Sequence, residues 1–280
     1  MKFDLLKVGH CNHPECVAMR GGRKSSIEFP ALVGLMEHPQ HGLMLYDTGY
    51  SKHFWEATRS FPECLYRMVT PPMLPPEEEL LSQLGERNIH ADQIHTIFIS
   101  HFHGDHVAGL RDFPNARFIS SREEYEEMRG KDRVTQLRNA YLAGLLPENF
   151  DERVTYAETR PVIATGLAGF EEGYDLLGDA SVMGIPLPGH TRSHLGLLFT
   201  DELERRIFLI GDACWKMEAL EGKRLPSKIA SFLFADNQSY EETFHRLAHL
   251  HAADPSVTIL PSHCSSSWQL HGNTCHVSHG

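Results

Sequence analysis

The sequence predicts an α/β fold of four layers, an αβ/βα sandwich in which two sheets lie between helical layers. Short apolar runs of strand length alternate with helix-length segments on both sides of the middle of the chain. Several of these runs are followed immediately by residues of types that can bind metal. No Pro-, Gly- or Ser-rich linker and no short repeat divides the 280 residues. We therefore expect a single domain over residues 1–280, with a loose tail after about residue 268.

The expected elements follow in chain order. Strands are predicted near residues 2–8, 31–37 and 42–47, and helical segments around 51–58 and 76–90. The next apolar run, Thr96 to Ile99, is typical of a buried strand. Two capping-box patterns, Ser121-x-x-Glu124 and Ser239-x-x-Glu242, indicate helix starts, and the second helix should run to about Ala253.

The run His-Phe-His-Gly-Asp-His at residues 101–106 follows the strand that ends at Ile99. Three imidazoles and a carboxylate packed so closely can fill parts of two adjacent coordination spheres, which is how a protein prepares a metal-activated hydroxide. Gly104 should let the backbone turn sharply between His103 and Asp105. A chance cluster in a chain with 19 histidines is the alternative.

Three further strand exits present a ligand-type residue. His190 follows the apolar stretch 181–186, Asp212 follows 207–211, and His263 follows 258–262. Each of these residues alone is weak evidence for metal binding, because a lone Gly-His or Gly-Asp is usually part of a turn. Open α/β sheets, however, gather their ligand sites at the carboxyl ends of strands. Together with residues 101–106, these exits predict one convergent metal site.

The ordered pattern His-x-His-x-Asp-His, His, Asp, His resembles that of the metallo-β-lactamase superfamily, and the resemblance spans nearly the whole chain. Shorter segments are similar to the N-acyl-homoserine-lactone lactonase branch of bacterial quorum-quenching enzymes. These segments are residues 9–11, 45–49, 121–125, 188–194 and 211–213.

The resemblance implies two divalent metal ions. One would be bound by His101, His103 and His190, the second by Asp105, His106 and His263, with Asp212 as the bridge between them. Zinc is the expected metal, with iron or manganese as alternatives, because imidazole suits all three. A metal-bridging hydroxide would be the nucleophile. Asp105, which would orient it or shuttle its proton, and Asp212 are the catalytic candidates.

Two positions depart from the lactonase branch. Trp215 stands three residues after Asp212, where the branch has a tyrosine. An indole donates one hydrogen bond but neither accepts one nor titrates, so it cannot replace a phenol in proton transfer. Packing in a pocket wall is its simpler role. Cys264 follows His263 where these lactonases tend to carry aspartate, and a buried thiol is expected there.

Two irregular apolar segments, 61–76 and 215–234, suit an acyl chain or another apolar group of a small substrate, and core or a homodimer face is the alternative. Within the second segment we expect Trp215, Met217 and Phe232 to line the pocket. Arg192 and His194 are expected to orient the substrate, with turn stabilisation as the alternative. Residues 10–16 offer two imidazoles and two thiols but lack a second ligand pair, so we expect a loop at the active-site mouth and not a zinc knuckle.

Composition excludes other classes of function. A net charge of -11 disfavours a nucleic-acid partner, because a phosphate backbone would be repelled. The apolar runs are too short to span a membrane, and residues 1–5 do not begin a signal peptide. A cytoplasmic location is therefore expected, and six scattered cysteines are expected to be reduced thiols.

The leading hypothesis is a dinuclear metal-dependent hydrolase that opens a lactone or cleaves a related ester. A glyoxalase II-like thioesterase and a single-iron sulfur dioxygenase are alternatives within the same superfamily. A binding or regulatory protein with little turnover is a third class. The complete ligand set argues against this last class, whereas Trp215 favours it.

Overall fold

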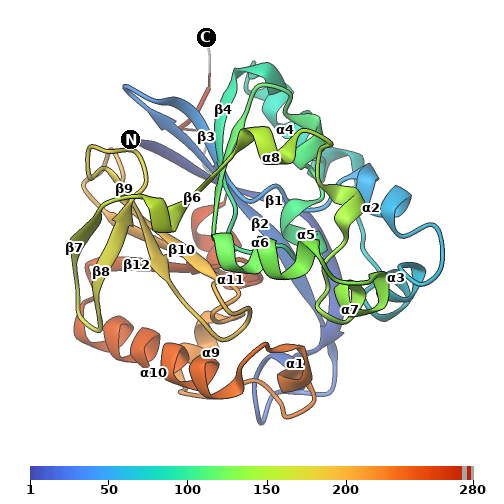
Figure 1. Ribbon diagram of the computed structural model, residues 1–280. Helices are drawn as coiled ribbons and strands as arrows, with labels where there is room; N and C mark the ends of the chain where they lie inside the picture. Colours follow the sequence, from blue (N-terminus) through green and yellow to red (C-terminus); the bar gives the residue numbers. More distant parts are fainter. Residues whose placement is uncertain (273–275, 279–280) are drawn as a thin grey trace.

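Two six-stranded sheets form the centre of the computed structural model, which describes residues 1–272 and 276–278 (Figure 1). The first sheet has the order β1-β2-β3-β4-β5-β6. Its strands are β1 (Lys2–Pro14), β2 (Ser26–His38), β3 (Gly42–Tyr46), β4 (Ile94–Phe98), β5 (Arg117–Ser120) and β6 (Val154–Tyr156). The second sheet has the order β12-β11-β10-β9-β8-β7. Its strands are β7 (Val162–Leu167), β8 (Phe170–Asp175), β9 (Val182–Pro186), β10 (Leu195–Thr200), β11 (Arg206–Gly211) and β12 (Val257–Pro261).

Helices are distributed along the whole chain. The α-helices are α1 (Glu15–Ala18), α2 (Lys52–Ala57), α3 (Cys64–Val69), α4 (Leu80–Glu86), α5 (Gly104–Val107), α6 (Arg122–Arg129), α7 (Arg133–Arg138), α8 (Phe150–Arg153), α9 (Met217–Glu221), α10 (Asn237–Ala253) and α11 (Ser265–His271). Short 3-10 helices are η1 (Pro76–Glu78), η2 (Ala91–Gln93), η3 (Leu110–Asp112), η4 (Ala143–Leu145), η5 (Ala157–Thr159) and η6 (Ala230–Leu233).

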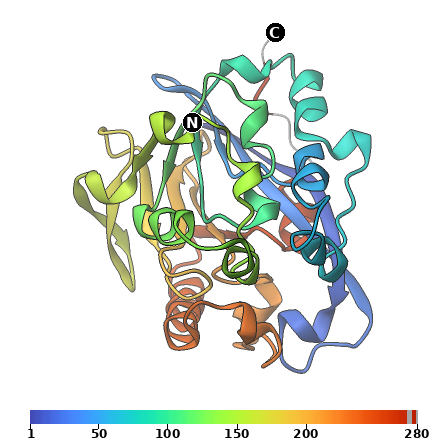
Figure 2. The same ribbon diagram turned by 45° about the vertical axis from the view of Figure 1, so that its right-hand side comes forward.

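Apolar side chains fill three layers of packing between these elements. Between the sheets, Phe3 and Met44 of the first sheet share one core with Leu197 and Leu209 of the second. The outer face of the first sheet packs against α2, α4, α6 and α8, and that of the second packs against α9 and α10. Figures 1 and 2 show α10 lying along the second sheet on the side away from the first. The predicted four-layer αβ/βα sandwich is confirmed.

The strand directions bring the predicted ligand positions to one edge. Strands β3, β4 and β5 are mutually parallel in the first sheet. In the second sheet β11 and β12 are parallel, and β9 runs the same way because both β9 and β11 are antiparallel to β10. The carboxyl ends of β9, β11 and β12 therefore lie together, as the strand-exit pattern predicts.

The N-terminal strand is longer than predicted. Strand β1 continues to Pro14 by antiparallel pairing with β2, in a register that places Asn12 opposite Glu28 and Pro14 opposite Ser26. The expected loop over residues 10–16 is therefore wrong: most of the segment is strand, and α1 begins at Glu15. Pairing with β2, the next strand along the chain, overrides the local turn signals of this segment.

Helix boundaries also differ from the sequence patterns. The helix expected over 76–90 is two shorter pieces, η1 and α4, because Glu79 between them has extended backbone. Helix α6 does begin after Ser121, but the Ser121 hydroxyl donates to Glu158 and does not cap the helix. Helix α10 begins earlier than predicted, at Asn237, because the Asp236 carboxylate caps it by accepting from the Ser239 amide.

The end of the chain, for which the sequence suggests a loose tail, is packed where the structure describes it. Helix α11 covers residues 265–271, and the backbone amides of His276 and Val277 donate to the buried Asp4 carboxylate at 2.8 and 3.0 Å. Val277 is itself buried. Cys275 and His279 lie outside the described residues.

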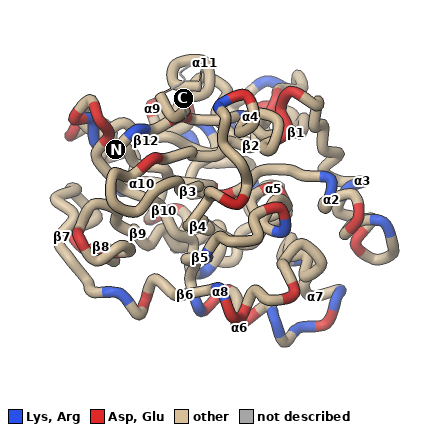
Figure 3. Tube along the Cα trace, turned by 90° about the horizontal axis from the view of Figure 1, so that it is seen from above, with Lys and Arg blue, Asp and Glu red and all other residues tan. Residues whose placement is uncertain are grey.

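Charges of both signs are spread over the surface (Figure 3). In the view of Figure 3, basic and acidic positions are interspersed around the periphery. Among the described residues, no helix is long and apolar enough to cross a membrane. Every described cysteine is a free thiol.

Candidate metal centre

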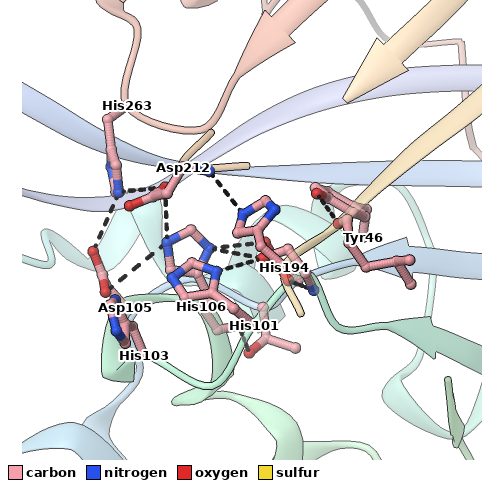
Figure 4. A network of polar contacts seen from close by, with 12 residues as sticks. Tyr46, His101, His103, Asp105, His106, His194, Asp212 and His263 are labelled. Atoms are coloured by element: carbon pink, nitrogen blue, oxygen red, sulfur yellow. Dashed lines mark hydrogen bonds and ion pairs between the residues drawn. The ribbon is translucent and has the colours of Figure 1, made fainter. Parts of the chain in front are cut away.

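The candidate ligands meet where the two sheets present their strand ends (Figure 4). Residues 101–106 lie in the connection that follows β4 and at the start of helix α5, whereas the other three candidates follow β9, β11 and β12. The ligand atoms fall into three overlapping groups, and within each group they lie within 4.8 Å of one another. The groups are His101 with His103 and His190, His101 with His106 and Asp212, and Asp105 with His106 and His263.

Two glycines allow this close approach. The Gly189 backbone has a φ of +131°, and a Cβ there would lie 2.2 Å from the backbone nitrogen of Tyr240 in α10. Only glycine fits immediately before His190. A Cβ on Gly104 would lie 2.8 Å from the Phe54 ring, and its φ is not positive. The chain does turn there, from extended backbone at His103 into α5 at Gly104, and close packing against Phe54 rather than a positive φ favours glycine at this position.

The first histidine group is buried and its rings are neutral. His190 Nε2 lies 3.1 Å from His103 Nδ1, and the His101 ring lies 4.4 Å from that of His103 between centroids. Burial lowers the pKa of His103 to about 4, and it holds the pKa values of His101 and His190 well below their ordinary range. Neutral imidazoles present the lone pairs that a metal ion requires.

Asp212 lies between two of these candidate groups, the first of His101, His103 and His190 and the second of Asp105, His106 and His263. Its Oδ2 lies 3.2 Å from His190 Nε2, whereas its Oδ1 lies 3.3 Å from His106 Nε2 and 3.1 Å from His263 Nε2. Burial opposes ionisation of Asp212, but these histidines outweigh it and hold the pKa of the carboxyl well below its usual range. A carboxylate with one oxygen toward each group is the arrangement that a bridging ligand needs.

Asp105 completes the second group beside His263. Its Oδ2 lies 3.5 Å from His263 Nε2, and its Oδ1 lies 4.0 Å from His106 Nε2. Burial opposes charge on His106, yet Asp212, Asp47 and Asp105 together raise the pKa of this imidazole well above its ordinary value. The carboxylates therefore create a negative field that a divalent cation would satisfy.

The donor set fits a divalent metal ion. His101 Nε2 and His106 Nε2 are buried and make no hydrogen bond, and His106 Nε2 faces carboxylate oxygens of Asp212 and Asp105 at 3.3 and 4.0 Å. The opposite nitrogen of each ring is anchored: His101 Nδ1 lies 2.9 Å from Ser100 Oγ and His106 Nδ1 lies 2.8 Å from Asp47 Oδ2. Such outer partners fix the tautomer and orientation of metal-binding imidazoles.

Asp47 is a site residue that the motif analysis missed. It follows β3, and it accepts from the Ser100 amide and hydroxyl as well as facing His106. The same strand-exit rule that found His190 could have found it, because Asp47 directly follows the apolar run 43–46. His263 is anchored differently, through Nδ1 and the Pro30 carbonyl at 2.7 Å.

Glu124 is a second missed residue. It was expected to cap α6, but its carboxylate turns inward and accepts from the Phe102 amide at 2.9 Å and the Thr191 hydroxyl at 2.7 Å. It therefore ties the segment that carries His101 and His103 to the segment that carries His190. Burial raises the pKa of Glu124 to about 7 in spite of these two bonds.

Of the residues predicted to bind substrate, the structure places some at a cavity and others away from it. Arg192 and Phe232 line a cavity of about 130 Å³ that opens beside His103 and His190. Met217 does not line this cavity and packs against the outer core of the second sheet. His194 is fully buried and accepts the Asp212 amide hydrogen through Nε2 at 3.0 Å, so its predicted contact with substrate is wrong.

Trp215 also lacks the pocket-lining position predicted for it. Its side chain is buried, is not part of the cavity lining, and donates from Nε1 to Asp212 Oδ2 at 2.9 Å. Cys264 is the expected buried thiol, and its Sγ accepts the Met217 amide hydrogen at 3.3 Å. Trp215 thus supports the Asp212 carboxylate, whereas Cys264 supports the backbone at the start of α9.

Sequence comparison assigns the family. A model of the metallo-beta-lactamase superfamily matches residues 27–263. The chain belongs to this superfamily. It is similar to a probable metallo-hydrolase of Mycobacterium tuberculosis, with 26% identity over 259 residues that cover 86% of this chain and 76% of that protein. It is also similar to the N-acyl homoserine lactonase AttM of Agrobacterium fabrum, with 25% identity over 253 residues that cover 90% of this chain and 88% of that protein.

Solved structures share the fold of this metallo-hydrolase. A mutant of AiiA from B. thuringiensis with bound N-decanoyl-L-homoserine superposes with a TM-score of 0.71 at 19% identity, covering 96% of this chain and 95% of that chain. The dizinc quorum-quenching lactonase AidC superposes with a TM-score of 0.64 at 17% identity, covering 94% of this chain and 87% of that chain. The predicted superfamily and hydrolase class are confirmed.

Proposed function

We propose that this metallo-hydrolase holds two divalent metal ions and opens a lactone or cleaves a related carboxylic ester. The observation that carries the proposal is the position of Asp212, whose two oxygens face two different histidine groups. When bound, a pair of divalent cations would supply Lewis acidity and a water nucleophile of lowered pKa. His101, His103 and His190 would hold one cation, Asp105, His106 and His263 the other, and Asp212 both.

The remaining chemistry belongs to side chains of the chain itself. Asp105 faces His106 and His263 and keeps 14% of its side chain exposed, which supports a role in orienting the nucleophile and accepting its proton. His194 and Asp47 do not meet substrate in this proposal. They hold the Asp212 backbone and the His106 ring, so that both ligands need little reorganisation during the reaction.

The cavity beside the first group supports a substrate with an apolar part. Phe232, Leu233 and Phe234 line one side of it, and Phe232 is 87% exposed. Arg192 and Asn139 add polar groups at the same cavity. The relative AttM is named an N-acyl homoserine lactonase, and a lactone with an acyl chain offers both an apolar tail and a polar amide. Zinc, a homodimer and a cytoplasmic location stay predictions.

Elemental analysis and a substrate screen test the proposal together. We expect two equivalents of metal per chain after loading with zinc, iron or manganese, and turnover of lactones above that of thioesters and phosphoesters in one matched panel. A chain that never exceeds one equivalent would refute the dinuclear site and favour the single-iron dioxygenase. Two equivalents with thioester cleavage alone would replace the lactonase by a glyoxalase II-like enzyme, and two equivalents without turnover would favour a binding protein.

A further inference from the structure

Trp215 is held so that its only hydrogen-bond donor points at the bridging carboxylate. The side chain is 6% exposed. Its rings are enclosed by Phe29, His190 and Phe234, at centroid distances of 6.3, 6.0 and 5.6 Å. Nε1 donates to Asp212 Oδ2 at 2.9 Å. Because an indole has one N–H and no acceptor, this bond uses all the hydrogen-bonding capacity of the residue.

The acceptor of this bond is already restrained on its backbone. The Asp212 amide donates to His194 Nε2 at 3.0 Å, which fixes the main chain and leaves the carboxylate free to rotate about its side-chain bonds. The indole N–H selects one rotation. In that rotation Oδ2 faces His190 and Oδ1 faces His106 and His263.

We propose that Trp215 is a positioning residue that orients the Asp212 carboxylate toward both metal groups and so sets the affinity of the pair for metal. This inference rests on the proposed two-ion function. The N–H withdraws electron density from Oδ2, the oxygen that faces the first group, and leaves Oδ1 the more basic oxygen toward the second group.

The position is consequently closed to substrate. A tyrosine here in the lactonase branch would present a hydroxyl that can both donate and accept, whereas the Trp215 donor is committed to a ligand. Its removal should therefore change metal binding first and substrate binding little. A residue that contacted the substrate would show the opposite order.

Stepwise metal titration against a chromogenic chelator tests this role. Trp215→Phe removes the donor, and a tryptophan analogue with sulfur in place of the ring N–H removes it while leaving the shape of the residue intact. We expect the weaker of the two metal-binding steps to lose about 10- to 100-fold in affinity in both variants, as is usual for an outer-shell partner. Activity should return at excess metal with an unchanged KM. Trp55→Phe, which alters a ring packed against Phe54 in α2, is the matched control and should leave both steps unchanged.

Each failure has a separate meaning. If the parent protein binds fewer than two ions, the proposed function is wrong before Trp215 is tested. If the parent binds two ions and the sulfur analogue binds both within twofold of the parent affinity, the positioning role is wrong. A raised KM at saturating metal in the analogue would also overturn the inference, because it would place Trp215 in contact with substrate.

Discussion

Among the residues that the structure describes, two histidine-rich regions have ligand atoms close enough together for a metal site, and they differ in how their nitrogens are used. One is the centre around Asp212. The other joins the β2–β3 hairpin to the connection between β8 and β9, and consists of His38, His41 and Asp179. In both, the ligand atoms lie within 4.8 Å of one another. Distance alone therefore does not distinguish them.

The hydrogen bonds of His38 argue against metal binding in the second region. Its Nδ1 accepts the amide hydrogens of Gln40 and His41, each at 3.1 Å, so the neutral ring must carry its proton on Nε2. That nitrogen lies 3.9 Å from Asp179 Oδ2 and has no lone pair for a cation. At the Asp212 centre the anchoring is reversed, because His101 and His106 are held through Nδ1 and their Nε2 atoms make no hydrogen bond.

The carboxylates of the two regions differ in the same way as the histidines: Asp179 is hydrogen-bonded, whereas Asp212 keeps one oxygen without a hydrogen bond. Asp179 accepts from the Ser181 side chain and amide, and these bonds outweigh its burial and, with His41, lower its pKa to about 2. Its charge is thus already satisfied by neighbours. Asp212 is also held ionised by its histidine neighbours, but its Oδ1 is buried, faces only the imidazole nitrogens of His106 and His263, and makes no hydrogen bond. The comparison teaches that an unsatisfied lone pair beside an anchored ring identifies a metal centre better than ligand spacing does.

The largest expected effect comes from Asp212→Ala. Removal of an outer partner costs 10- to 100-fold in affinity, and loss of a ligand shared by two ions should lower turnover by about 1000-fold or more. Elemental analysis and kinetics at saturating metal measure it, with circular dichroism as the check on folding. Turnover within tenfold of the parent in a folded variant would exclude the bridging role.

A smaller effect is expected from Asp47→Asn. The amide cannot supply the negative charge that faces His106 Nδ1, so the imidazole becomes a weaker ligand. We expect a loss of about 10- to 100-fold in metal affinity, measured by chelator competition. The matched control is Asp179→Asn, the same change in the second region, which should leave affinity unaltered. Equal losses in the two variants would contradict the distinction drawn between the regions.

Glu124→Gln tests the buried carboxyl that joins the two ligand segments. Burial raises the pKa of Glu124 to about 7, above its unfolded value, so its stabilising contribution is present at low pH and is lost as pH rises toward 7. A glutamine oxygen and amide can keep both bonds without ionising. The variant should therefore be more stable than the parent above pH 7, by up to about 3 kcal/mol, and similar to it near pH 4.

Chemical denaturation of the chelator-treated protein at a series of pH values measures this difference. A parent and variant that differ equally at pH 4 and pH 8 would show that Glu124 does not titrate in this range. A variant that is less stable at every pH would show that the carboxylate, and not its neutral form, ties the two segments.

The features that could be predicted from the sequence are those that depend on a local pattern of residues. Apolar runs followed by His or Asp predicted the strand ends that the structure brings together, because burial of a strand and the polarity of its exit are written in consecutive residues. Metal binding by these residues stays a prediction. The sandwich architecture followed from the alternation of strands and helices together with the resemblance.

These misses share a physical cause, because each depends on a contact made in the folded chain that the local sequence pattern does not show. The extension of β1 to Pro14 needs β2, and the inward turn of Glu124 needs the Phe102 amide and the Thr191 hydroxyl. The burial of His194 under Asp212 and the bond of Trp215 to the same carboxylate require the folded positions of β10 and β11. Residue type named these side chains as candidates, but only the tertiary contacts distinguish support from substrate binding.

The smallest expected effect is that of His41→Gln in the second region. Its ring is partly exposed and faces Asp179 at 3.1 Å, an exposed pair that contributes little to stability. We expect unchanged metal content and turnover. The depressed pKa of Asp179 means that its stabilising contribution is present above its unfolded value near 4 and is lost as the pH falls toward 2. The parent and variant should therefore show similar unfolding midpoints at pH 7, because Ser181 and not His41 is the main cause of that shift. A loss of one equivalent of metal in His41→Gln would break the comparison and make the hairpin a third metal site.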